Sequence, residues 1–168
     1  MAEITVGDIK KLRGLTGSGI LDCRNALEEA DGDSTKAQAI LREKGLASAA
    51  KKATRTAAEG VVESYIHNGS RVGVLLELNC ETDFVSRIPE FKELAHHLTM
   101  QVAAMAPEYI DRAEMPEDDP RNPEEVCLLQ QPFIRDPNRV VQDLVTELAA
   151  RVGENVRVRR FARFALGE

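Results

Sequence analysis

The hydrophobic pattern changes its period at Gly60, and this change constrains the fold more than any other feature of the sequence. The residues Val62, Ser64 and Ile66 follow a two-residue alternation before Asn68-Gly69, and a second alternation follows it, with Val72, Val74, Leu76 and Leu78. An Asn-Gly pair between two alternating segments is the strongest short-range signal of a β-hairpin. The sequence therefore predicts two antiparallel strands joined by a tight turn.

The segment before this hairpin has helical periodicity instead. Thr5 with Asp8, then Ser18, then Asp33 each stand where the cap of a helix is expected, and Gly45 is placed to end the third helix. We therefore expect residues 1–45 to form a compact three-helix bundle. Residues 46–59 are rich in Ala and basic, with few large apolar groups, which predicts a semi-rigid linker.

The segment after the hairpin alternates between helical and extended patterns. We expect a helix from Pro89 to the residues before Pro107, a connector, a short strand, a second helix that Gly153 ends, and a last long strand. The last three cover residues 126–129, 141–152 and 156–166. Together they predict an α+β domain at 60–168, an antiparallel sheet with helices packed on one face.

The connector at 107–125 carries most of the charge asymmetry of the chain. It holds four of the seven prolines and eight acidic residues against two arginines, so its net charge equals the −6 of the whole chain. This composition predicts a mobile segment. Because the rest of the chain is close to neutral, nucleic acid is not the expected partner.

The composition also bears on location. No stretch approaches the roughly 20 apolar residues of a membrane span, and the mixed, acidic start of the chain is unlike a signal peptide. The three widely spaced cysteines favour reduced thiols over a disulfide framework or a zinc site. We expect a cytoplasmic protein without a membrane partner.

Two groups of residues suggest functions that we weighed against structural roles. Cys80 with His96 or His97 suggests an enzyme, yet Cys80 continues the apolar alternation, the adjacent histidines diverge on a helix, and no known catalytic or nucleotide-binding motif is present. The arginines of the last strand suggest RNA binding, but no series of aromatic residues accompanies them. We favour structural roles for both groups, and we expect no catalytic residue, bound metal or cofactor. The arginines are Arg157, Arg159, Arg160 and Arg163.

Phe84 has two open interpretations. The chain has five Phe, two Tyr and no Trp, so a Phe in the polar segment that leaves the second strand is notable. Residues at such junctions usually cover the core. However, a ring held between two rigid elements and surrounded by polar groups is typical of an interface anchor.

Several segments together resemble the elongation factor Ts family, the nucleotide exchange factors of elongation factor Tu. The resemblance extends over nearly the whole chain except 107–123, and its most specific part is Leu78-Asn79-Cys80-Glu81-Thr82-Asp83-Phe84-Val85. The other matching segments are 9–13, 16–27, 41–45, 49–53, 59–60, 131–133 and 153–161.

The resemblance implies a function that the residues alone do not. Thr82, Asp83, Phe84 and Val85 would form the exchange element. Phe84 would enter the partner's G domain, displace the groups that hold Mg²⁺ and so release GDP. The bundle at 1–45 would correspond to the family's ubiquitin-associated (UBA-like) domain, and Asp22, Cys23 and Arg24 would lie near a second contact that this domain makes. A different class of function is a ubiquitin-like-binding or chaperone-type adaptor, which would use the bundle without the Phe84 segment.

The resemblance also implies a homodimer. Longer family members carry a second copy of the strand-helix unit and a coiled-coil insertion, where this chain has only the connector. Short members replace the missing half by pairing through their sheets. The strand at 156–166 carries apolar residues on both faces, Val158 and Phe161 as well as Phe164, which is consistent with such a contact.

Overall fold

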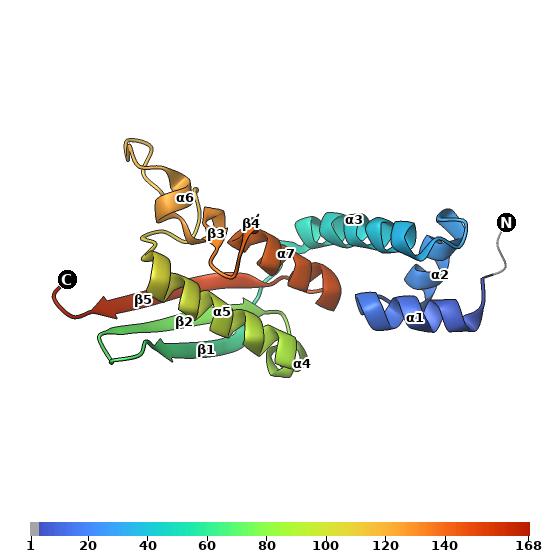
Figure 1. Cartoon of the computed structure of the whole chain (residues 1–168), viewed down its shortest axis with the longest axis horizontal. Coiled ribbons are helices and arrows are strands. Elements are labelled where there is room, and N and C mark those ends of the chain that lie inside the picture. Colours follow the sequence, from blue (N-terminus) through green and yellow to red (C-terminus); the bar gives the residue numbers. More distant parts are fainter. Residues whose placement is uncertain (1–3) are drawn as a thin grey trace.

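The computed structural model describes residues 4–168, so the first three residues of the predicted bundle lie outside the described part. A helical part and a part with a sheet follow each other along the long axis of the molecule (Figure 1). The helical part contains α1 (Val6–Thr16), α2 (Ile20–Glu29) and most of α3 (Ser34–Lys52). The second part contains β1 (Glu59–Ile66), β2 (Val72–Cys80), α4 (Asp83–Arg87), α5 (Pro89–Met105), α6 (Pro123–Val126), a 3-10 turn η1 (Leu128–Gln130), β3 (Pro132–Phe133), β4 (Asp136–Val140), α7 (Val141–Val152) and β5 (Arg157–Ala165).

Two of the three predicted caps are confirmed in the bundle. Thr5 and Asp8 form a reciprocal capping box at the start of α1, and the Asp33 carboxylate accepts hydrogen bonds from two backbone N–H groups of α3. Ser18 is not the cap of α2, because the N-cap is Gly19 and it makes no side-chain bond. A small core holds the three helices together and includes Leu12, Cys23, Leu27 and Leu41.

The third helix is longer than predicted. It does not end at Gly45 but continues to Lys52, and so takes in half of the predicted linker. Gly45 instead allows α3 to pack closely against α7, because a Cβ atom built at this position would lie only 3.1 Å from Cβ of Ala150. Ala49 is buried against the core of the second part. The first half of the Ala-rich segment is therefore a packed helix, and the division into domains stays a prediction.

The predicted α+β fold of the second part is confirmed. The three long strands form an antiparallel sheet in the order β1-β2-β5, and the β1–β2 turn contains Gly69 and Ser70 at positive φ. Long α5 lies across one face of this sheet (Figure 1). Its Phe91 and Leu98 are buried with Val74, Leu76 and Leu78 of β2, residues whose two-residue spacing puts them on one face.

The segment between α5 and α7 differs most from expectation. The predicted strand at 126–129 is wrong, because Val126 ends α6 and Leu128 begins η1. The Asn122 side chain accepts a bond from Glu124 N–H and Pro123 occupies the first helical position, which start a helical turn there. The short strands β3 and β4 were not predicted.

The acidic connector has defined contacts, although we expected a mobile segment. The Arg121 guanidinium donates to the carboxylates of Glu108 and Asp119, and the Tyr109 hydroxyl donates to Asp119. The bonds from Arg121 hold the pKa of both carboxyl groups below their usual range. One basic side chain thus joins the two ends of this segment, whose mobility stays a prediction.

Among residues 4–168, no helix has the length and apolar character that crossing a membrane requires.

Candidate partner-binding site

Phe84 lies in the five-residue helix α4, between the end of β2 and the start of α5. Its side chain is 80% exposed, whereas the next residue, Val85, is 8% exposed and belongs to the core. The helix is therefore attached through Val85 and presents Phe84 to solvent. This exposure excludes the interpretation of Phe84 as a residue that covers the core.

The start of α4 is held by a residue from a distant part of the chain. Glu154, in the loop between α7 and β5, accepts hydrogen bonds from the backbone N–H groups of Glu81 and Thr82, at 3.1 and 3.0 Å. It also accepts a 2.6 Å bond from the Thr82 hydroxyl. Thr82 is the N-cap of α4 and makes no side-chain bond to the helix itself.

Asn155 joins the same region to the end of α3. Its backbone N–H donates to the Glu81 carboxylate at 2.7 Å. Its side-chain amide donates to the carbonyl oxygens of Ala53 and Arg55, at 3.1 and 2.7 Å. Arg55 in turn forms a 3.5 Å ion pair with Glu81. Three segments that are far apart in the sequence therefore meet just behind Phe84.

Asp83 of the predicted exchange element and two further residues of α4, Ser86 and Arg87, surround Phe84 with polar groups. Asp83 and Arg87 form an exposed ion pair at 2.7 Å, one turn apart on α4. The Ser86 hydroxyl donates to the Asp83 carbonyl oxygen. Both charged side chains remain open to solvent, so they are available to a partner that covers Phe84.

Cys80 lies behind this element and has the properties of a structural thiol. It is fully buried and donates a hydrogen bond to the Thr82 carbonyl oxygen at 3.1 Å. Burial, and then the nearby charge of Glu154, raises the pKa of the thiol to about 11. Because the thiolate is the reactive form, Cys80 is a poor nucleophile at neutral pH.

The two histidines do not join Cys80 in a common site. His96 lies 3.4 Å from the Glu63 carboxylate, on β1, and close to the Tyr65 ring. His97 instead contacts Arg135 and the Phe133 ring. Within the described part of the chain, no group of three or more His, Cys, Asp or Glu side chains is arranged to hold a metal ion.

The second predicted contact lies on α2 in the bundle. Asp22 and Arg24 are exposed, and Arg24 pairs with Glu28 at 2.8 Å. Cys23 has no exposed surface and lies in the bundle core near Ser18 and Thr16. Cys23 therefore supports this surface from inside, while its two neighbours in the sequence face outward.

The sequence pattern did not predict that large apolar side chains near Asp22 are exposed. They are Leu15, Ile20 and Leu21, of which Leu21 is 72% exposed. Leu21 lies off the apolar face that Cys23 and Leu27 form, and this mismatch was the available signal. A cleft between the bundle and α7, lined in part by Gly17, Asp22 and Arg151, lies next to this surface.

The face of the sheet opposite α5 carries a third apolar surface, which we call the open sheet face. Ile66, Gly73 and Phe164 are neighbours across β1, β2 and β5, and Phe164 is 70% exposed. The predicted two-sided pattern of the last strand is confirmed, since Val158 is buried and Phe161 packs against the core. The exposed apolar residues of this face are Val62, Ile66, Leu75, Phe164 and, after β5, Leu166.

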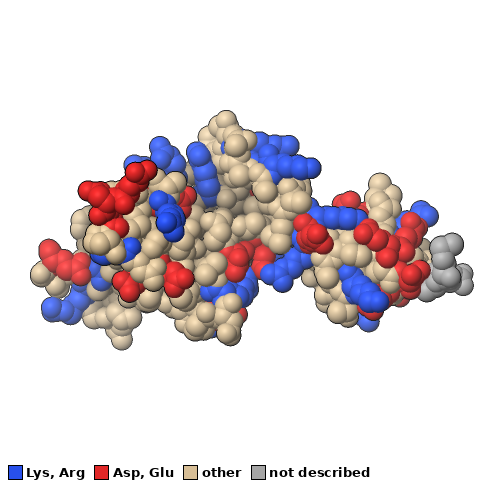
Figure 2. Space-filling model, turned by 90° about the horizontal axis from the view of Figure 1, so that it is seen from above, with Lys and Arg blue, Asp and Glu red and all other residues tan. Residues whose placement is uncertain are grey.

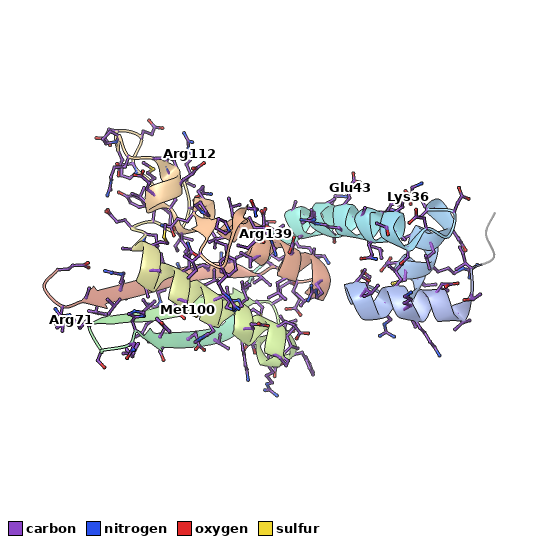
Figure 3. The ribbon with its side chains drawn as sticks, in the orientation of Figure 1. Lys36, Glu43, Arg71, Met100, Arg112 and Arg139 are labelled. Atoms are coloured by element: carbon purple, nitrogen blue, oxygen red, sulfur yellow. The ribbon has the colours of Figure 1, made fainter. Side chains whose placement is uncertain are left out.

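Two of the four arginines that suggested RNA binding are paired within the chain. Arg160 forms a 2.8 Å ion pair with Glu77, and Arg163 forms one of 2.6 Å with Glu168. On the face of the molecule seen in Figure 2, basic and acidic side chains are interspersed over both parts. The hairpin end that carries Arg71 lies at the opposite end of the sheet from α4 (Figure 3). These observations favour structural roles for the strand arginines.

Comparisons with known proteins point to one family. A sequence model described as "Elongation factor TS" matches residues 24–121. The chain is similar to elongation factor Ts of Carboxydothermus hydrogenoformans, with 49% identity over 195 residues, 98% of this chain and 90% of the relative. It is also similar to elongation factor Ts of Thermotoga petrophila, with 49% identity over 194 residues, 99% of this chain and 98% of the relative.

Proposed function

The chain belongs to the elongation factor Ts family of translation elongation factors, and we propose that it is the guanine nucleotide exchange factor of elongation factor Tu. In this role it binds the GDP-bound partner, accelerates release of GDP and leaves when GTP binds. It makes and breaks no covalent bond. The bacterial cytoplasm, where the partner works, is its proposed location.

The single observation that carries this proposal is the exposed Phe84 ring on a firmly attached short helix. Covering one such ring stabilises a complex by about 2 kcal/mol, so neighbouring contacts must add to it. We propose that Phe84 enters the G domain of the partner and moves the groups that hold Mg²⁺. The ring then favours the nucleotide-poor conformation, as any shift of that equilibrium requires.

Thermodynamic linkage makes this effect reciprocal. If the factor weakens the binding of GDP to its partner, GDP weakens the binding of the factor to the same extent. Release of GDP and dissociation of the factor on nucleotide binding thus follow from one coupling free energy. Thr82, Asp83 and Val85 contribute by fixing and flanking the ring.

The bundle supplies the second proposed contact. Exposed Leu15, Ile20 and Leu21 beside charged Asp22 and Arg24 have the make-up of a protein interface, an apolar centre with a polar rim. We propose that this surface binds the G domain as well. Two separate contacts would orient the partner against Phe84.

We further propose a homodimer through the open sheet face. Exposed apolar patches of this kind mark interaction surfaces, and two antiparallel sheets pack well face to face. Ile66, Leu75 and Phe164 support this arrangement, because in the single chain they remain uncovered. Light scattering coupled to size-exclusion chromatography tests it, and a monomer at micromolar concentration would contradict it.

The experiment for the function is release of fluorescent GDP from elongation factor Tu, followed with and without this chain at several concentrations. We expect the release rate to rise with factor concentration to a plateau. Binding without any acceleration would instead support the adaptor function, and the proposal would then be wrong.

A further inference from the structure

The orientation of α4 does not come from the short helix itself. A helix of five residues is too short to be stable in isolation. Thr82, its N-cap residue, makes no hydrogen bond to the N–H groups of the helix. The Thr82 hydroxyl donates to Glu154 instead, from 72 residues further along the chain. The direction in which Phe84 points therefore depends on the loop at 153–155.

The Glu154 carboxylate holds the start of α4 with both of its oxygens. Both carboxylate oxygens are used, Oε2 by the N–H groups of Glu81 and Thr82, and Oε1 by the Thr82 hydroxyl. Hydrogen bonds to a carboxylate are stronger than bonds between neutral groups. Cys80 adds a fourth bond nearby, to the carbonyl oxygen of Thr82. Together these bonds fix the backbone immediately before Phe84.

The same loop fixes the end of the helix that comes from the bundle. The buried side-chain amide of Asn155 donates both of its N–H groups, to the carbonyl oxygens of Ala53 and Arg55. The Lys52 ammonium donates to the Gly153 carbonyl oxygen at 2.7 Å. Residues 153–155 thus contact the end of α3 on one side and the start of α4 on the other.

We propose that Glu154 and Asn155 are positioning residues for nucleotide exchange, which hold Phe84 in a fixed orientation relative to the bundle. This role rests on the proposed exchange function. With the bundle bound to the partner, a fixed link places the ring where it must enter, and no binding energy is lost in ordering it. A loose link would let the factor bind through the bundle without driving GDP release.

The first test compares Glu154→Ala and Glu154→Gln in the full-length chain. We expect Glu154→Ala to lower the maximal rate of GDP release by about tenfold, the scale of small misplacements in reacting groups. The factor concentration at half-saturation should change much less. Glu154→Gln should keep most of the rate, because its amide oxygen still accepts both N–H groups and its NH₂ group donates to the Thr82 hydroxyl.

The second test needs no partner. Hydrogen exchange of the Glu81 and Thr82 backbone amides should become faster in Glu154→Ala and stay slow in Glu154→Gln. Glu63→Ala is the matched control, since the Glu63 carboxylate lies on β1, pairs with His96 of α5 and has no hydrogen bond or ion pair to residues 80–84. That variant should leave both amides and the maximal release rate unchanged. If Glu154→Ala does not fold, Thr82→Val removes one of the three bonds while keeping the shape of the residue.

The outcomes separate this inference from the exchange function. If the unaltered chain accelerates release and Phe84→Ala does not, but Glu154→Ala or, in its place, Thr82→Val matches the unaltered chain, the positioning role is wrong and the exchange function stands. Equal losses in Glu154→Ala and Glu154→Gln would also contradict positioning by geometry. If the unaltered chain accelerates nothing, the exchange function fails and the positioning role fails with it.

Discussion

The proton on Cys80 contributes to the attachment of the Phe84 segment. The thiol donates to the Thr82 carbonyl oxygen, and burial raises its pKa from 9.0 to about 11. An acid whose pKa is raised by folding stabilises the folded state as long as the unfolded chain also keeps the proton. This contribution is complete below pH 9 and is lost as the pH rises through about 11.

The free energy of unfolding should therefore fall between pH 9 and pH 11 more steeply in the unaltered chain than in Cys80→Ser. Serine can donate the same hydrogen bond but does not ionise in this range. Urea unfolding of both proteins over a pH series measures the difference, which should be constant below pH 9. Parallel curves across the whole range would contradict the role given to the Cys80 proton.

At the scale of single residues, part of the site could be predicted from the sequence. The polar neighbours of Phe84 suggested an interface anchor but left a core position open, and the alternation of β2 placed Cys80 in the core. Glu154 could not be found in this way, because it acts on residues 72 positions away through the fold. Leu21 was missed because a helical pattern predicts which face is buried but not which apolar residues remain outside it.

Close contact between α3 and α7 joins the two parts of the molecule at the scale of elements. Gly45 allows this contact, since a Cβ atom there would approach Ala150 Cβ to 3.1 Å. Gly14, in the interior of α1, has no heavy atom within 4 Å of the same position. Gly14 and Gly45 thus share a helical backbone conformation and differ in how much free space surrounds them.

Replacing each glycine by alanine should separate these two situations. Gly14→Ala should raise the free energy of unfolding by about 1 kcal/mol, because alanine favours a helix interior. Gly45→Ala should fall short of that gain by about 1 kcal/mol or more, because the added methyl group crowds α7. Thermal or urea unfolding decides, and equal gains for the two variants would contradict a close α3–α7 contact.

Elements with strong local signals were predicted well. The hairpin, α5 after Pro89 and α7 before Gly153 each have a turn, a cap or a breaker in the sequence. The predicted end of α3 at Gly45 was wrong because glycine both ends helices and allows close packing, and only the three-dimensional structure distinguishes these two roles. The predicted strand at 126–129 was wrong because a four-residue apolar run does not distinguish a strand from a helical turn.

For the molecule as a whole, we propose that the open sheet face is the contact surface of a homodimer. A charge in the middle of an apolar interface is costly, so Phe164→Glu should convert a dimer to a monomer at micromolar concentration. Met105→Glu, at an exposed apolar position at the end of α5, should remain a dimer. Light scattering gives the mass of each protein directly. A dimer that persists in Phe164→Glu would place the contact elsewhere.

We propose that the exposed Phe84 ring drives GDP release from elongation factor Tu. The most direct test is the maximal release rate at saturating concentrations of the unaltered chain, Phe84→Ala and the control Met105→Ala. Losing about 2 kcal/mol of ring burial should lower the rate of Phe84→Ala by about tenfold or more. Since Phe84 is exposed, the free energy of unfolding of the Phe84→Ala protein should differ from that of the unaltered chain by less than about 0.5 kcal/mol. Met105→Ala should match the unaltered chain, and a Phe84→Ala protein that does so too would contradict the account.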